Sequence, residues 1–188
     1  FYTDTACVVE FAEDTTAAVT ITSSSVDPSQ VTKADVIGGY SVANHKTTGL
    51  ELIDSVFPKY TMAPDLILCP NWSHDPEVAA VMAAKGENIN GVFEADAVID
   101  LASTDNGGAT YYTEVPALKK KNNISHVNQL ACWPKVKLGD RVFNYAVQLA
   151  GSISATDNND DLGGGTPCES ASNKTLQADL SLIHISEP

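Results

Sequence analysis

The sequence predicts an α/β protein in which a layered core with a parallel sheet follows a β-rich N-terminal element. Three short runs in the middle of the chain are apolar without alternation, which is typical of strands covered on both faces. They are "PDLILCP" (64–70), "EADAVIDLA" (94–102) and "QLACWP" (129–134). Helical patterns separate these runs, and such alternation favours a layered α/β core. The 188 residues are enough for about one ordinary domain.

The β-rich element comes first. Residues 1–32 are rich in Thr, Val, Ser and Ala, and "ACVVEFA" (6–12) and "AAVTITS" (17–23) each predict a strand. Turn signals follow at Asp27-Pro28 and Gly38-Gly39. We expect residues 1–35 to form the end of a preceding domain or an insertion, residues 36–179 an α/β core, and residues 180–188 a non-native tail.

Two helices are predicted around the first buried strand. The first should start at Thr47 or Thr48 and stop at Pro58, since apolar residues between them recur at helical spacing. The second should start at Asp75-Pro76-Glu77, where Asp75 can cap free backbone amides and Pro76 suits the first helical position. Small residues throughout its first turns predict close packing on more than one side. Gly91 is expected to end this helix in the left-handed conformation.

The remaining elements alternate in the same way. "TEVPALKKKNN" (113–123) predicts a helix whose lysines suit its negative end. "KVKLGDRVF" (135–143) predicts a hairpin about Gly139-Asp140, and "NYAVQLAGSISATD" (144–157) a further helix. "NNDDLGGGTP" (158–167) predicts a loop.

The composition argues against several partners. The net charge is −13, with 24 acidic and 11 basic residues, so binding to nucleic acid is not expected. The one dense basic run, Lys119-Lys120-Lys121, is expected to be a solvated helix end. No apolar run reaches the roughly 18 residues that a membrane span needs. Cys69 and Cys132 lie in apolar runs, which favours buried free thiols in a reducing compartment.

Ser73, His74 and Asp75 stand in a row and contain the three residue types of a hydrolase triad. They follow the carboxyl end of a predicted strand, where ligands bind in open α/β sheets. However, a triad needs three side chains aimed at one another, and consecutive residues point in divergent directions. The strained G-x-S-x-G turn is also missing. We therefore expect helix capping and loop packing here, with hydrolysis by these residues as an alternative.

The other candidate sites fail at positions that set their geometry. Asp157, Asn159 and Asp161 match the first ligands of a calcium loop, but Leu162 stands where glycine is required. Cys168 stands where that loop needs its glutamate. The "GGG" at 163–165 lacks the lysine of a phosphate loop, and the four histidines show no zinc spacing. We expect no catalytic, cofactor-binding or metal-binding residue.

Beyond these patterns, residues 27–178 resemble the central part of a contractile tail sheath protein of tailed bacteriophages. The longest matching stretch is "PDLILCPNWSHDPEVAAVMAAKGENINGVFEADAVIDL". Shorter ones occur in the family order: "DPSQVTKADVIGGY", "TTGLELIDSVFPKY", "YTEVPALKKKNN", "CWPKVKLGDRVF", "QLAGSISATDNND" and "SASNKTLQAD". The chain departs from the family at Asn71-Trp72, where a Gly-aromatic pair is usual, and at Ser170-Ala171, where Ser-Pro is usual.

The resemblance implies a non-enzymatic structural subunit with a subtilisin-like α/β core that lacks the protease's catalytic function. Such subunits stack in rings around the tail tube and contract on a baseplate signal, which drives the tube through the host envelope. The implied partners are neighbouring sheath subunits, the tube protein and the baseplate, without cofactor, and the implied location is the virion after assembly in the host cytoplasm. A sheath from a phage-derived bacteriocin or injection system, and an α/β hydrolase, are the alternatives.

The ends of the chain also carry an expectation. The chain starts at Phe1, and "LSLIHISEP" at its end resembles read-through of a sequencing adapter. We therefore expect an internal fragment that does not form a contractile sheath by itself.

Overall fold

The computed structural model describes residues 27–158 and 179–180. The chain divides into two compact units, residues 1–30 and 31–188. In the first unit the described part is a short turn, η1 (Pro28–Gln30), in which the Asp27 carboxylate accepts the Ser29 amide at 2.9 Å. The strands predicted at 6–12 and 17–23 lie outside the described residues. All elements below belong to the second unit.

A parallel three-stranded sheet forms the centre of this unit, as the apolar runs predict. Its strands β3 (Leu66–Leu68), β4 (Asp96–Asp100) and β5 (Gln129–Cys132) lie in the order β3-β4-β5. Both pairings are parallel, with Leu66 opposite Asp96 and Ala97 opposite Gln129. Four of the five β4 residues are buried, which explains why that run is apolar without alternation. The α/β prediction is confirmed.

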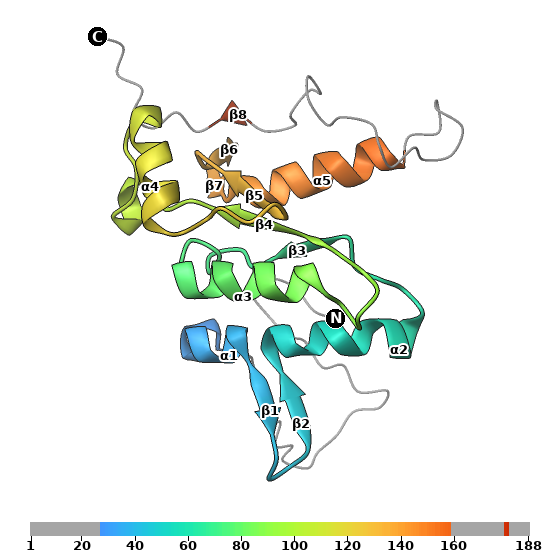
Figure 1. Ribbon diagram of the computed structural model, residues 1–188. Helices are drawn as coiled ribbons and strands as arrows, with labels where there is room; N and C mark the ends of the chain where they lie inside the picture. Colours follow the sequence, from blue (N-terminus) through green and yellow to red (C-terminus); the bar gives the residue numbers. More distant parts are fainter. Residues whose placement is uncertain (1–26, 159–178, 181–188) are drawn as a thin grey trace, which may run out of the picture. The chain divides into compact units, whose positions relative to one another are not determined.

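Helix α3 (Pro76–Glu87) packs on one face of the sheet and carries a further layer on its other side (Figure 1). Val78 and Met82 are fully buried in a core that includes Ile67 of β3 and Ile99 of β4. The further layer consists of α1 (Lys33–Ile37) and a 3-10 helix, η2 (Gly49–Ser55), which both contact α3. The prediction that this helix packs on more than one side is therefore confirmed.

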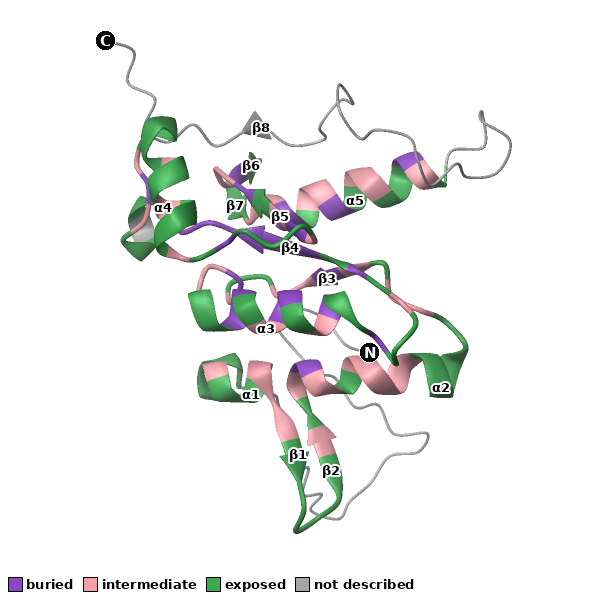
Figure 2. Cartoon of the chain, viewed as in Figure 1, coloured by how far each residue is buried: buried purple, intermediate pink, exposed green. Residues whose placement is uncertain are grey.

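Helix α5 (Tyr145–Asp157) covers the opposite face of the sheet. Successive strand residues point to opposite faces, and Ala97 and Ile99 belong to the core under α3 whereas Val98 packs with Cys132 and Ala146 under α5. Figure 2 shows the buried residues concentrated on β4 and on parts of the helices beside it. The sheet is thus covered by helices on both faces.

Two hairpins and a short helix complete the unit. β1 (Gly39–Ser41) pairs with β2 (Lys46–Thr48), and β6 (Val136–Leu138) pairs with β7 (Arg141–Phe143) about Gly139-Asp140, as predicted. β8 (Asp179–Leu180) adds to the other side of β6. The segment between β4 and β5 holds η3 (Thr104–Asn106), η4 (Tyr112–Glu114) and α4 (Val115–Lys121), whose lysines are exposed at its end as expected.

The helix predicted from Thr47 or Thr48 to Pro58 is wrong at both ends. Thr47 and Thr48 belong to β2, and the apolar spacing that follows forms the 3-10 helix η2. Pro58 lies inside α2 (Val56–Tyr60) rather than stopping a helix. It is tolerated there because the first-turn amides of an α-helix have no partner within the helix, so a missing N–H removes no bond.

Gly91 does not cap α3, contrary to the prediction. The helix ends at Glu87, and its C-cap Asn88 is not left-handed. Asn90 (φ 54°) and Gly91 (φ 77°) instead form a tight turn in which Ile89 and Phe93 exchange two backbone hydrogen bonds, at 2.8 and 3.0 Å. The left-handed residues are therefore used three and four positions beyond the end of the helix, where the chain reverses into β4.

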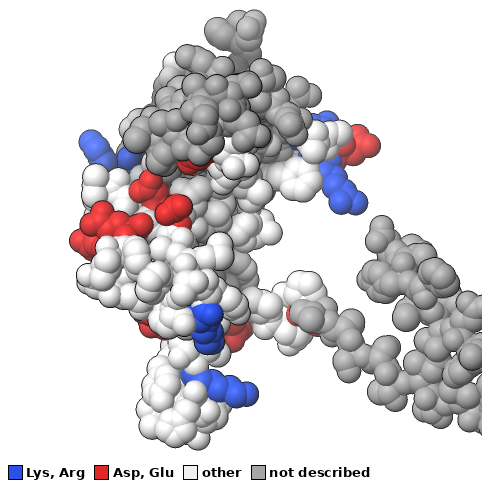
Figure 3. All heavy atoms as spheres, turned by 90° about the vertical axis from the view of Figure 1, so that its right-hand side faces the viewer, with Lys and Arg blue, Asp and Glu red and all other residues white. Residues whose placement is uncertain are grey.

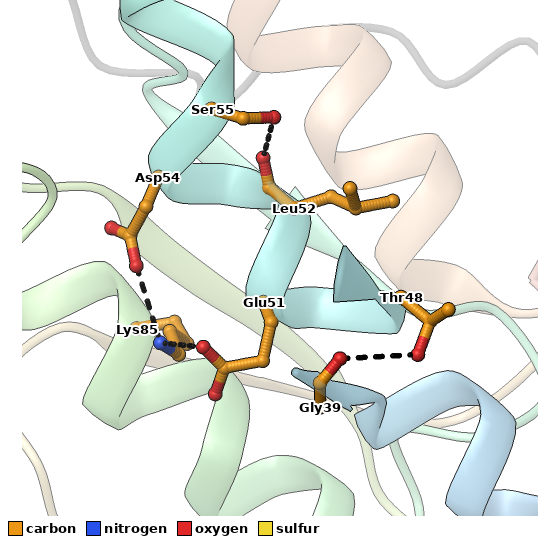
Figure 4. A network of polar contacts seen from close by, with 7 residues as sticks. All are labelled: Gly39, Thr48, Glu51, Leu52, Asp54, Ser55 and Lys85. Carbon is orange, nitrogen blue, oxygen red and sulfur yellow. Dashed lines mark hydrogen bonds and ion pairs between the residues drawn. The ribbon is translucent and has the colours of Figure 1, made fainter. Parts of the chain in front are cut away.

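An ion-pair network joins η2 to α3. The Lys85 ammonium lies 2.7 Å from the Glu51 carboxylate and 3.3 Å from that of Asp54 (Figure 4). The Glu51 hydrogen bond, opposed by partial burial and supported by Asp54, raises the pKa of Lys85 above its ordinary value. All three side chains are partly exposed, so we attribute orientation of the layer rather than much stability to this network.

Gly86 gives a test of the packing between α3 and β4. A Cβ at Gly86 would lie 2.4 Å from the Ala95 carbonyl oxygen, whereas a Cβ at Gly151 of α5 would meet nothing within 4 Å. We expect Gly86→Ala to lower the free energy of unfolding, against the helix propensity that favours alanine by about 1 kcal/mol. Gly151→Ala is the matched control and should raise that free energy. Urea unfolding of both variants checks this, and a stabilised Gly86→Ala would contradict the packing.

Candidate functional site at the carboxyl ends of the parallel strands

Three polar side chains from different segments meet at the carboxyl ends of the parallel strands, where α/β sheets commonly bind ligands. Ser73 lies in the loop after β3, Asp100 ends β4 and Cys132 ends β5, directly opposite Asp100. We call these three residues the carboxyl-end cluster. All three are buried, with 1% of Ser73 and 8% of Asp100 exposed.

Asp100 is the centre of this cluster. Its Oδ1 accepts the backbone amide of Ala146 in the first turn of α5 at 2.8 Å, and its Oδ2 lies 3.4 Å from the Ser73 hydroxyl. The residue at the N-cap position of α5, Asn144, makes no capping bond and donates instead to Asn71 Oδ1 at 2.9 Å. A carboxylate from the sheet therefore replaces the local cap and also meets the positive end of the helix.

The electrostatics of Asp100 are dominated by burial. Burial raises the pKa of its carboxyl group above the ordinary value, and the Ala146 amide, the Ser73 hydroxyl, His74 and Lys135 offset part of this rise. The pKa of the neighbouring Cys132 thiol is raised as well, because burial and the charge of Asp100 bring it to about 12. Cys132 is therefore a protonated, weakly nucleophilic thiol at neutral pH.

The Ser73 hydroxyl makes two hydrogen bonds to Asp100. Its Oγ accepts the Asp100 backbone amide at 3.0 Å and donates to the carboxylate of the same residue. Within the described residues His74 hydrogen-bonds neither Ser73 nor Asp75, although it is close enough to Asp100 to influence the titration of that residue. The hydroxyl is thus committed to hydrogen bonds with Asp100, and His74 does not act as its base in this arrangement.

Asp75 caps α3, as predicted. Its Oδ1 accepts the Glu77 amide at 2.9 Å, and Pro76 occupies the first helical turn. Lys33 of α1 lies 3.3 Å from the Asp75 carboxylate and 2.7 Å from that of Glu77. Burial raises the pKa of Asp75, but the Glu77 amide and Lys33 outweigh it and lower the pKa overall. The row Ser73-His74-Asp75 is therefore divided between a sheet contact and a helix cap.

The other candidates do not assemble into a site in the described part. Asp157 is the last residue of α5, while Asn159, Asp161 and the glycines at 163–165 lie outside the described residues. Among residues 27–158 and 179–180 no group of three or more His, Cys, Asp or Glu could hold a metal ion. Cys69 and Cys132 are both free, but only Cys132 is buried as predicted, whereas Cys69 is half-buried. In the same residues no helix is long and apolar enough to cross a membrane.

Sequence reasoning missed Asp100, which organises the cluster. The available signal was a single carboxylate at the end of an otherwise apolar, buried run, since such a charge needs a partner when it is buried. Trp72 and Trp133 are partly buried and both pack against the core under α3.

Comparisons of the chain with protein-family models, with curated proteins and with solved structures found no match.

The cap of α3 can be tested by separating it from the ion pair. Asp75→Ala removes both the capping acceptor and the Lys33 contact, so we expect about 1 kcal/mol lower stability to urea. Asp75→Asn keeps a capping oxygen and loses only a partly exposed ion pair, so its stability should stay within about 0.5 kcal/mol of the original. Equal unfolding midpoints for the Ala variant and the original chain would contradict the capping role.

The buried carboxylate predicts a specific pH dependence. Because folding raises the pKa of Asp100, the folded state binds its proton more tightly, so the contribution of this group is present below the unfolded pKa and is lost as pH rises through the folded pKa. The stability of the original chain relative to Asp100→Asn should therefore fall as pH rises from about 4. Urea unfolding at several pH values measures this difference. If the stability difference between the original chain and Asp100→Asn did not change with pH, the raised pKa of Asp100 would be contradicted.

Proposed function

We propose that this chain is part of a structural subunit of a contractile phage tail sheath, which surrounds the tail tube and contracts to drive it through the host envelope. The observation that carries the proposal is the resemblance of residues 27–178, above all the continuous stretch from Pro64 to Leu101. This stretch forms β3, the loop with Ser73, helix α3, the turn at Gly91 and β4. It is therefore also the centre of the α/β core.

The construction of this core suits such a role. A contracting sheath needs a subunit that exchanges one set of neighbour contacts for another while its own fold persists. Here α3 is tied to α1 through Lys33 and to η2 through Lys85, and Asp100 ties α5 to the sheet. We further propose that the sheet with helices on both faces is the sheath version of a subtilisin-like arrangement.

The surface supports membership of a larger assembly. Many large apolar side chains are exposed in the described part, and several lie on hairpins or helix ends. Exposed apolar side chains that gather into one patch mark interaction sites. In the proposed sheath these side chains contact neighbouring subunits, the tail tube or the baseplate.

Two other assignments have weaker support. A sheath from a phage-derived bacteriocin or injection system would use the same subunit chemistry, and only the neighbouring genes distinguish it. A hydrolase is favoured only by the position of Ser73 and Asp100 at the carboxyl ends of the strands. A serine-directed fluorophosphonate probe tests it, since labelling that is lost in Ser73→Ala would favour the hydrolase over the sheath.

Electron microscopy tests the proposed function. The complete reading frame that encodes this chain is expressed in bacteria, and we expect the product to form hollow cylinders of stacked rings. Gold-labelled antibody against the chain should decorate these cylinders along their whole length, because a sheath repeats one subunit throughout. Decoration of the cylinder ends alone would contradict a sheath subunit, and so would a product that remains monomeric at all concentrations.

A further inference from the structure

The two helical layers on the central sheet differ in the core beneath them. Under α3 the core includes large side chains that are fully buried, such as Met82 and Ile99. The core under α5 is smaller, and its buried members are Val98, Cys132 and Ala146. The residues that α5 itself buries have small side chains: Ala146, Ala150 and Thr156. Figure 2 shows most of α5 as intermediate or exposed. Because the free energy gained by burial follows the apolar area removed from water, α5 is held less strongly than α3.

Polar contacts anchor α3 along its whole length. At its start, Lys33 of α1 forms ion pairs with two carboxylates. In its middle, amide side chains at and just before the start of β5 donate to the carbonyls of Ala79 and Ala83, at 3.3 and 3.0 Å. Near its end, Lys85 forms ion pairs with η2. Helix α3 is therefore fixed to its neighbours at both ends and in between.

Helix α5 is fastened at its start alone among the contacts between described residues. The Ala146 amide in its first turn donates to Asp100 Oδ1 at 2.8 Å, and its N-cap residue Asn144 donates to Asn71 Oδ1 at 2.9 Å. Near the other end, the Thr156 hydroxyl donates to a carbonyl of its own helix and so adds no attachment to the sheet. One buried bond, between Asp100 and Ala146, thus joins α5 directly to the sheet.

The ion pairs of the described part also belong to the α3 side. They involve Lys33 and Lys85, whereas α5 carries one formal charge, that of Asp157 at its last residue. The chain has a net charge of −13, and Figure 3 shows acidic groups gathered on the face that it views. Mutual repulsion of such charges disfavours the compact state. Attraction between opposite charges opposes this repulsion at α3 rather than at α5.

We propose that α5 is a conformational device that separates from the sheet, with Asp100 as its latch, while the parallel sheet and the α3 layer stay folded. Elements with few buried apolar contacts open at a lower free energy than the core around them. Opening breaks the bond between Ala146 and Asp100 and uncovers the Val98 side chain and the Cys132 thiol. The closed state predominates, and the open state lets this part of the core change shape without global unfolding. The inference goes beyond the proposed function and does not rest on it.

Thiol labelling below the unfolding transition tests the separation. Cys132 is 2% exposed beneath α5, and Val78 of α3 is 0% exposed on the other face of the sheet. Val78→Cys therefore supplies a matched buried thiol under α3. The whole chain with this substitution is treated with iodoacetamide at several urea concentrations, and mass spectrometry of its peptides measures the labelling rate at each cysteine relative to the unfolded chain.

We expect Cys132 to be labelled at least about tenfold faster than the thiol introduced at position 78. The rate at Cys132 should also depend less on urea, since local opening exposes less surface than global unfolding. Equal rates with the same urea dependence at both thiols would overturn the proposal, because α5 would then unfold only together with the whole core.

Two further substitutions in the same background identify the latch. Asp75→Ala removes a cap that the opening of α5 leaves in place, so it should speed labelling at position 78 about fivefold and leave labelling of Cys132 unchanged. Asp100→Ala removes the latch, so it should speed labelling of Cys132. An equal acceleration of both thiols by Asp75→Ala contradicts a separate opening, and an unchanged rate at Cys132 in Asp100→Ala contradicts the latch.

Hydrogen exchange gives the same comparison on the original chain and does not depend on any variant that fails to fold. The amides of α5 should exchange faster than those of α3, with a weaker dependence on urea. Equal protection of the two helices would overturn the proposal.

Discussion

The buried carboxylate of Asp100 is the interaction on which the described core depends. It sits at the end of the central strand, receives the hydroxyl of Ser73 from the loop before α3, and accepts the first-turn amide of α5. One side chain thus connects the sheet to the start of one helix and to the loop that leads into the other. Burying a carboxylate is unfavourable, and the helix amide and its dipole offset that cost only in part, which leaves the pKa raised.

This constraint has a consequence for the proposed function. Ser73 and Asp75 are two residues apart, yet one is bound to the sheet and the other to the start of α3 and to Lys33. The stretch Ser73-His74-Asp75, which contains the residue types of a hydrolase triad, therefore connects the sheet, helix α3 and the layer that contains α1. A subunit built in this way can keep its interior unchanged while its exposed apolar and charged surfaces exchange partners, which is the property that the sheath proposal needs.

The sequence predicted elements correctly where the signal is local. The apolar runs of β3, β4 and β5, the cap at Asp75 and the hairpin about Gly139 each depend on a few adjacent residues. It failed where two local signals compete. The apolar spacing after Thr48 suits an α-helix, but the chain enters from β2 and tightens into the 3-10 helix η2. The left-handed conformation of Gly91 would suit a helix cap as well as it suits the tight turn between Ile89 and Phe93 that the residue forms.

By itself the sequence determined which segments are strands and where α3 begins, because burial on both faces and helix capping leave patterns within a few residues. Only the tertiary structure decided what Ser73 does. Its partner Asp100 is 27 positions away, and the amide that shares that carboxylate lies a further 46 positions along the chain. Contacts of this kind arise when parallel strands align their carboxyl ends, and no local pattern in a single sequence records that alignment.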